Sequence, residues 1–431
     1  MSFKKDFFSI MTIRLVLAIL GFAIVTISAR ILTLEDFGSI TLVVTVMSIL
    51  VRLLSVGLGQ AAQFYGAKDI LRGSDYKIII RKLLLVLIVL SFIVITLLDN
   101  YIKINLLTRD AYGIYDSFKY FTPLILLHFV ILLYFLGKRD LKKYAVLSLI
   151  PIIATLICFS LYSTLDSKLD VVMLAWYVQF SVGAVLGIFY FYRKRSIESK
   201  NIREVVKYCY QSYIVSTLNF ISQKISIVLI ASSLTPSSIA LFYAGKSISE
   251  VTTVIYGALG PLILSYTSED ESGHKSKDLF ERVSRITLVL FSTIALIIAL
   301  FAPILIPFIF GDKYSQSADI LVILLPGVIF LTQQRLIENY LYGIKKQVNI
   351  VYIHILSIVL LTFGIPFLSS LFGLSGAVMA ITLTTLTTLL TMMLLLYITT
   401  RIKPISYLFA TKNDYHLIIL IFKKYLSRCI N

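Results

Sequence analysis

Two apolar stretches joined by a short turn decide how this chain can fold: SYIVSTLNFISQKISIVLIASSL at 212–234 and IALFYAGKSISEVTTVIYGALGP at 239–261. Each is long enough to cross a bilayer as a helix. Each also carries charge in its interior, Lys224 in the first stretch and Lys246 and Glu250 in the second. A charge at the centre of a bilayer costs on the order of 3 kcal/mol or more, so it usually faces a watery cavity or a partner. The two stretches therefore predict a polar cavity lined by membrane helices.

The polar residues of these stretches recur at helical steps of three or four, so each stretch gathers them on one face. The first face comprises Ser212, Ser216, Asn219, Gln223 and Ser226. The second comprises Tyr243, Lys246, Glu250, Thr253, Gly257 and Gly260.

The whole chain has the composition of a polytopic membrane protein. It is 58% hydrophobic and 15% charged over 431 residues, which is more apolar surface than a soluble domain can bury. We predict an all-α protein with about twelve membrane spans. They lie at 10–31, 37–59, 82–98, 118–136, 144–164, 170–192, 211–233, 239–262, 286–310, 318–342, 349–371 and 374–400.

The net charge of +17 is distributed unevenly over the loops. When alternate loops are assigned to opposite sides, one side together with both termini holds 29 of the 40 Lys and Arg residues. The other side holds six: Arg30, Lys103, Arg109, Lys119, Lys168 and Lys313. This is the positive-inside pattern and predicts two cytoplasmic termini. The basic charge is thus explained by topology and attraction to anionic lipids, and we expect no nucleic-acid partner.

A weak internal repeat predicts two bundles of six helices. ARILTLEDFGSIT at 29–41 and ASSLTPSSIALFY at 231–243 both read Ala-x-x-Leu-Thr before a turn and a new span. The spans that follow these two motifs carry their polar residues in nearly the same register. With an even number of spans per half, both halves cross the membrane in the same orientation. We predict an N-terminal bundle at 1–192, a basic cytoplasmic linker at 193–210, a C-terminal bundle at 211–400 and a basic amphipathic cytoplasmic tail at 401–431.

Several motifs together resemble one family. ARILTLEDFGSI at 29–40, LFYAGKSISE at 241–250, APILIPFIFGDKY at 302–314 and FGLSGAVMA at 372–380 are similar to the Wzx-type polysaccharide flippases of the multidrug/oligosaccharidyl-lipid/polysaccharide exporter superfamily. The resemblance implies a cationic cavity between two bundles in a bacterial inner membrane. It also implies an undecaprenyl-pyrophosphate-linked oligosaccharide as cargo, for O-antigen or another surface polysaccharide, with a polymerase and a chain-length regulator as pathway partners. Many relatives carry an Asp where this chain has Gln223, so the resemblance does not imply a proton- or cation-coupling role for this helix.

The charged residues inside the spans fit an anionic cargo on chemical grounds. Cations bind pyrophosphate, arginine by its bidentate fork and lysine as a point charge. The predicted cationic cavity residues are Arg14, Arg52, Lys224, Lys246 and Arg335, with Glu250 and Glu338 as gating residues or charge-pair partners. The predicted polar lining comprises Ser48, Asn219, Gln223 and Tyr243.

Each of these residues also has a simpler explanation. Arg14 lies a turn inside its span, from which its side chain can reach the inner surface. Lys246 with Glu250, and Arg335 with Glu338, are spaced to neutralise each other within one helix. Glu35 and Asp36 precede a span on the outer side, where helix capping explains them better than catalysis.

The alternatives predict features that the sequence lacks or reverses. A membrane polymerase or other glycosyltransferase predicts a large outer loop with catalytic charges, whereas the longest outer loop runs only from about Asp99 to Ser117. A multidrug or cation antiporter of the same superfamily predicts an acidic cavity. The related lipid II flippases usually have fourteen spans. Because we find no nucleotide-binding motif and no metal-ligand spacing among the histidines, we expect no cofactor, no metal and no enzymatic activity, and leave the energy source open.

Overall fold

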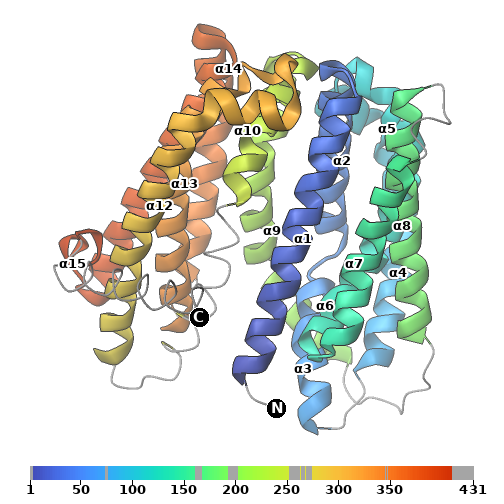
Figure 1. Cartoon of the computed structure of the whole chain (residues 1–431). Helices are drawn as coiled ribbons and strands as arrows, with labels where there is room; N and C mark the ends of the chain where they lie inside the picture. The colour runs from blue at the N-terminus through green and yellow to red at the C-terminus, as the bar shows by residue number, and fades with distance from the viewer. Residues whose placement is uncertain are drawn as a thin grey trace, which may run out of the picture. The chain divides into compact units, whose positions relative to one another are not determined.

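The computed structural model describes residues 3–72, 76–160, 167–192, 202–251, 263, 267, 274–344, 346 and 348–409. All regular elements among these residues are helices, which confirms the all-α prediction (Figure 1). In lipid a backbone must satisfy its hydrogen bonds internally, and a helix does so within a single segment.

The longer helices follow the apolar runs of the sequence. They are α1 (Phe3–Ile31), α2 (Leu34–Leu54), α3 (Leu58–Arg72), α4 (Lys77–Leu106), α6 (Thr122–Gly137), α7 (Leu141–Cys158), α8 (Lys168–Tyr192), α9 (Ile202–Ser233), α10 (Pro236–Val251), α12 (His274–Phe310), α13 (Ser317–Gly343) and α14 (Val348–Thr400). The short elements are η1 (Arg109–Ala111), α5 (Tyr112–Phe118), η2 (Lys119–Phe121), η4 (Asp312–Tyr314) and α15 (Pro404–Leu408).

Ten segments of the described residues are long and apolar enough to span a membrane. One of them covers 52 residues, Asn349–Thr400, and contains a break at Gly373, whose φ of 58° is left-handed and therefore suits glycine. The predicted span at 239–262 lies only partly within the described residues. The number twelve stays a prediction.

The chain forms two compact units. Unit 1 comprises Met1–Ser247 and Ile309–Tyr314, and unit 2 comprises Ile248–Phe308 and Ser315–Asn431. The predicted bundle boundaries at 1–192 and 211–400 stay predictions. The linker at 193–201 and the tail from 410 onward lie outside the described residues.

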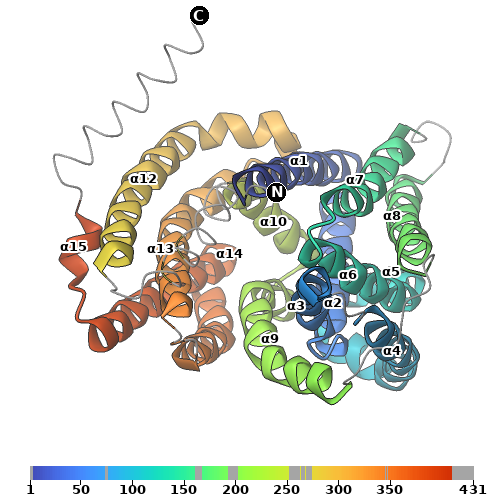
Figure 2. The ribbon, with the colours of Figure 1, turned by 90° about the horizontal axis from the view of Figure 1, so that it is seen from below.

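The central helix of unit 1 is α2. About two-thirds of its apolar window is buried, against 6% for α1, and it packs against α6 and α9 (Figure 2). Its first turn is capped as predicted: the Thr33 hydroxyl accepts a hydrogen bond from the Asp36 amide at 3.1 Å and donates one to the Asp36 carboxylate at 2.7 Å. Gly38 then lies so close to α10 that a Cβ atom would meet the Pro236 carbonyl oxygen at 1.9 Å.

In unit 2, α13 packs along α14, and 61% of the apolar window of α13 is buried.

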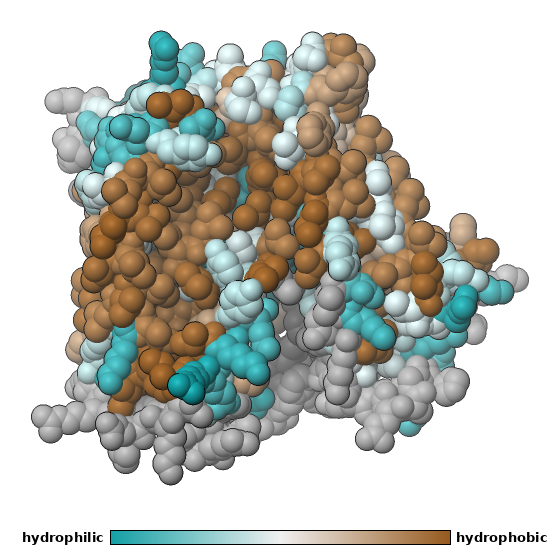
Figure 3. All heavy atoms as spheres, turned by 180° about the vertical axis from the view of Figure 1, so that it is seen from behind, coloured by the Kyte–Doolittle hydropathy of each residue, from teal (hydrophilic) through white to brown (hydrophobic). Residues whose placement is uncertain are grey.

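Elsewhere the helices present apolar side chains to their surroundings: Leu97, Phe308 and Phe363 are each more than 70% exposed. Figure 3 shows such residues covering the middle of the helices, with hydrophilic residues gathered towards the ends. This is the surface that a lipid bilayer requires.

Candidate functional site: a cationic wall in unit 1 and a buried charge network in unit 2

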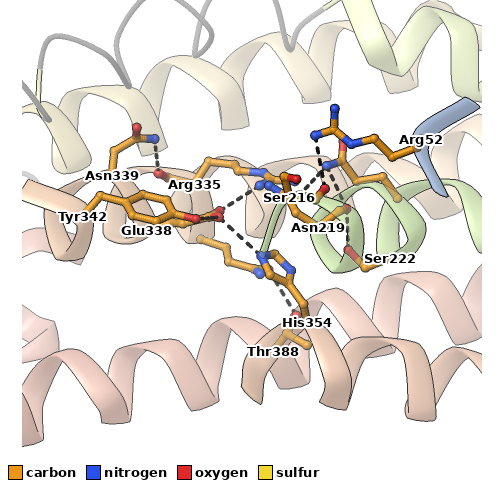
Figure 4. A network of polar contacts seen from close by, with 12 residues as sticks. Arg52, Ser216, Asn219, Ser222, Arg335, Glu338, Asn339, Tyr342, His354 and Thr388 are labelled. Carbon is orange, nitrogen blue, oxygen red and sulfur yellow. Dashed lines mark hydrogen bonds and ion pairs between the residues drawn. The ribbon is translucent and has the colours of Figure 1, made fainter. Parts of the chain in front are cut away.

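Arg52 lies half-buried near the end of α2, where the guanidinium group sits between two aromatic rings. Its central carbon lies 5.5 Å from the ring centroid of Phe129 and 5.7 Å from that of Phe220. Nη2 donates to the Ser216 carbonyl at 3.3 Å (Figure 4). When the Gln60 side-chain amide is oriented so that its oxygen faces Arg52, this oxygen accepts hydrogen bonds from Nη1 of Arg52 at 2.7 Å and from Nη2 at 2.6 Å.

All these partners of Arg52 are neutral. Among the described residues no carboxylate lies within ion-pair distance of its guanidinium, and its buried Nε has no hydrogen-bond partner. A half-buried cation without a counter-charge is costly unless an anion approaches it. This arrangement favours a negatively charged ligand.

Helix α9 connects Arg52 with the lysines predicted alongside it. The Ser216 carbonyl on α9 holds Arg52, and the Gln223 carbonyl, seven residues further on, accepts from Nζ of Lys246 at 3.5 Å. Seven residues correspond to about 10 Å along a helix. Lys224, half-buried, follows Gln223 directly, and no hydrogen bond or ion pair joins its ammonium to a described residue. We call the segment from Ser216 to Lys224, with Arg52 and Lys246, the cationic wall.

The predicted polar lining is held by local hydrogen bonds. Nε2 of Gln223 donates to Oδ1 of Asn219 at 2.6 Å, which braces two polar residues on the same face of α9. The Ser48 hydroxyl donates at 2.7 Å to the Thr45 carbonyl within its own helix. Tyr243 is half-buried, with its ring centroid 6.1 Å from that of Phe37.

Two predicted residues stand apart from these contacts. Arg14 is exposed on α1 and makes no hydrogen bond or ion pair with the described part of the chain. Glu250 is half-buried near the end of α10. Both residues stay predictions as cavity residues.

In unit 2, α13 carries a buried charge network. Nη1 of Arg335 donates to Oε2 of Glu338 at 2.8 Å, as their spacing predicts, and the Glu338 side chain is 2% exposed. The Tyr342 hydroxyl donates to Oε1 of Glu338 at 3.4 Å. Nε2 of His354, on α14, lies 3.4 Å from the same oxygen, at ion-pair distance but without hydrogen-bond geometry (Figure 4).

Two further polar pairs involve the residues that directly precede Arg335 on α13, and they were not predicted from the sequence. The Ser284 hydroxyl donates to Oε1 of Gln333 at 2.5 Å, and the Thr388 hydroxyl donates to Oε1 of Gln334 at 3.1 Å. The run Gln333-Gln334-Arg335 inside an apolar span was a sequence signal for such a network. His354 gave no such signal, because its partner lies on another helix.

The two groups differ in chemistry. Arg335 and Glu338 neutralise each other, whereas Arg52 in the cationic wall contacts only neutral groups among the described residues. Among the described residues no group of three or more His, Cys, Asp or Glu side chains is arranged to hold a metal ion. Such a wall can bind an anion by direct charge and by hydrogen bonds from nitrogen.

Comparisons with known proteins place the chain. A family model described as "Polysaccharide biosynthesis protein" matches residues 3–263. No curated protein matches significantly. Among solved structures, an inward-facing multidrug resistance MATE family transporter of the MOP superfamily aligns with a TM-score of 0.76 at 15% identity, covering 89% of this chain and 94% of the other.

Two further structures show the same fold. The outward-facing form of a MATE family transporter has a TM-score of 0.68 at 15% identity, covering 92% of this chain and 95% of the other. A MOP superfamily transporter from Pyrococcus furiosus, described as having a binding pocket of reverse polarity, has a TM-score of 0.68 at 14% identity, with coverages of 92% and 95%. At such identities the likeness shows the fold alone.

Proposed function

The chain belongs to the polysaccharide biosynthesis protein family, and from this premise we propose that it is a flippase for a lipid-linked oligosaccharide. The cargo is a polyprenyl-pyrophosphate carrying an oligosaccharide repeat unit. The protein moves it from the cytoplasmic to the outer leaflet of a bacterial inner membrane, for O-antigen or another surface polysaccharide. Both termini then lie in the cytoplasm, as the distribution of basic residues predicts.

The observation that carries this proposal is Arg52. Among the described residues its half-buried guanidinium has neutral partners only. Lys224 and the Lys246 contact follow about 10–12 Å further along α9. A pyrophosphate group supplies the negative charge that Arg52 lacks among the described residues. The rings of Phe129 and Phe220 shield the guanidinium from water, which strengthens its attraction for a phosphate.

The same observation disfavours a drug or cation antiporter, the activity that the names of the MATE neighbours suggest. A cationic drug would meet like charge at Arg52, Lys224 and Lys246. A polymerase remains an alternative that the experiment below separates from the flippase.

The test uses the purified protein in liposomes that contain a fluorescent polyprenyl-pyrophosphate oligosaccharide. A membrane-impermeant glycosidase reports how much of this lipid reaches the opposite leaflet. We expect the wild type to expose it and Arg52→Gln to slow exposure by about 10- to 100-fold, because a hydrogen bond to a charged group contributes about 1.5–3 kcal/mol. Arg52→Lys should retain part of the rate, because the charge remains and the fork is lost.

Arg109→Gln is the matched control, since Arg109 is an exposed arginine that makes no hydrogen bond or ion pair with a described residue. It should flip the lipid at the wild-type rate. The proposal is wrong if the wild type exposes no more lipid than empty liposomes, or if it lengthens the glycan instead. Polymer formation would identify a polymerase.

A further inference from the structure

A second cationic feature lies in unit 1, at the end where α1 stops and α2 begins. It is a cavity of about 520 Å³. Its lining includes Arg30 from the end of α1, Lys168 from the start of α8 and Lys313 from η4. These are three of the six basic residues that the charge pattern assigns to the outer side of the membrane. We call this the outer cavity.

The outer cavity is separate from the cationic wall. Arg52 lies 18 residues beyond the first residue of α2, Leu34, which itself lines the outer cavity. That separation corresponds to about 27 Å along the helix. A ligand bound at one place therefore does not occupy the other.

The balance of charge in the outer cavity is positive. Glu35 is the one acidic residue in its described lining, against three basic ones. Asp36 is turned to the Thr33 hydroxyl in the helix cap, and Asp312, next to Lys313 in the chain, does not line the cavity. Burial lowers the pKa of Lys313, and the neighbouring charge of Lys168 lowers it further. The two lysines thus repel each other across the cavity, and an anion between them would relieve the repulsion.

Backbone carbonyls hold two of the cations in place. Nε of Arg30 donates to the Ile309 carbonyl at 2.7 Å, and Nζ of Lys313 donates to the carbonyls of Leu32 and, at 3.3 Å, of Arg30. The Tyr314 hydroxyl adds a bond to the Ala29 carbonyl at 3.2 Å. These bonds fix the positions of the side chains, and the carbonyl groups themselves carry no formal charge. A phosphate oxygen is a stronger acceptor than a carbonyl for the same donors.

Three long helices also begin at the outer cavity. Leu34 opens α2, Lys168 opens α8, and Ser237 is the second residue of α10; all three line the cavity. The start of a helix presents backbone N–H groups and a partial positive charge, and both attract anions. The start of α2 is already capped and carries Glu35 and Asp36, so it adds little. Three side-chain cations and the starts of α8 and α10 therefore act in the same direction.

We propose that the outer cavity is a binding site for a phosphate group. The ligand is a phosphate ester on the headgroup of a lipid in the outer leaflet or a free phosphate, since both present the same oxygens to Arg30, Lys168 and Lys313. Binding there does not require that the cargo of the cationic wall be an oligosaccharide lipid.

The test measures ligand binding to the full-length protein in neutral detergent by native mass spectrometry. The two probes are phosphatidylglycerol and inorganic pyrophosphate. The informative variant is Lys168→Ala, because Lys168 is exposed and its ammonium makes no hydrogen bond or ion pair with a described residue, so the fold should persist. Arg109→Ala removes a basic residue of the same predicted side that does not line the cavity, and serves as the matched control.

We expect the wild type and Arg109→Ala to bind a probe equally and Lys168→Ala to bind it about tenfold more weakly, the loss typical of one charge-assisted contact. Lys168→Glu should weaken binding further. Displacement of phosphatidylglycerol by pyrophosphate would identify the phosphate group alone as the ligand. Binding of the lipid without pyrophosphate would identify the headgroup. Binding of neither probe, or equal affinity in the wild type and both Lys168 variants, would overturn the proposal.

Discussion

The buried pair of Arg335 and Glu338 permits a quantitative prediction about stability. The two side chains are 11% and 2% exposed, and their charged atoms lie 2.8 Å apart. Replacing one partner removes the counter-charge that the other contacts at 2.8 Å, and breaking a buried pair in this way typically costs about 3–5 kcal/mol. We therefore expect Glu338→Gln to lower the free energy of unfolding by about that amount.

The expected shift in melting temperature follows from the size of the chain. With an unfolding entropy of about 2.1 cal/mol/K per residue, the 431 residues give a shift of about 1 °C per kcal/mol if they unfold together. Glu338→Gln should then melt about 3–5 °C below the wild type. The measurement is thermal unfolding of the purified protein in detergent, followed by intrinsic fluorescence.

A pair with the same spacing but different burial provides the control. Lys143 pairs with Asp140 at i,i+3 on the surface, where the side chains are 40% and 27% exposed. Solvent screens such a pair, so Lys143→Ala should cost less than about 1 kcal/mol. The double variant Arg335→Met/Glu338→Gln should recover much of the loss, because neither charge is then left alone. The reasoning from burial is refuted if Glu338→Gln lowers the free energy of unfolding no more than Lys143→Ala does. It is also refuted if the loss in the double variant equals the sum of the losses in Arg335→Met and Glu338→Gln.

Three further predictions concern unit 1. Gly38→Val should abolish stable folding or lower the melting temperature by several degrees, because even a Cβ would meet the Pro236 carbonyl at 1.9 Å; Gly21→Val, where nothing lies within 4 Å, should melt like the wild type. Thr33→Ala should cost about 1 kcal/mol in thermal unfolding through loss of the cap of α2, and an unchanged melting temperature would contradict the cap. Lys168→Ala should raise the pKa of Lys313, because it removes a neighbouring positive charge. In the wild type, stability rises with pH between the lowered pKa of Lys313 in the folded state and its usual value in the unfolded state, and the variant should narrow this interval. NMR of ¹³C-methylated lysines measures the pKa of Lys313 directly, and an unchanged value in Lys168→Ala would contradict the repulsion.

The helical fold was predictable because lipid imposes a simple rule on sequence: long apolar runs become helices. The rule is weaker where residues are polar. Helix α3 (Leu58–Arg72) lies in what the sequence presented as a cytoplasmic loop, and its packing on α6 explains why a less apolar segment is ordered there. Likewise, α4 extends to Leu106 and α5 follows, in a region that hydropathy alone reads as loop.

Those parts of the candidate site that lie within a single helix were predictable from the sequence. The Arg335–Glu338 contact lies within one helix, so spacing alone predicted it. The contacts of Arg52 with Phe129 and of His354 with Glu338 join different helices, and the periodicity of a single helix carries no information about them. The outer cavity depends on the same kind of contact, since it joins Arg30 to Lys313 across most of the chain.

The neutral surroundings of Arg52 also bear on electrical behaviour. Moving one elementary charge across a membrane changes its energy by about 2.3 kcal/mol for each 100 mV of potential. A guanidinium inside a spanning helix, with no carboxylate at ion-pair distance among the described residues, retains that charge when the helix shifts. Any rearrangement that carries α2 through part of the field is therefore electrogenic. The guanidinium of Arg52 would then make such a rearrangement sensitive to the membrane potential.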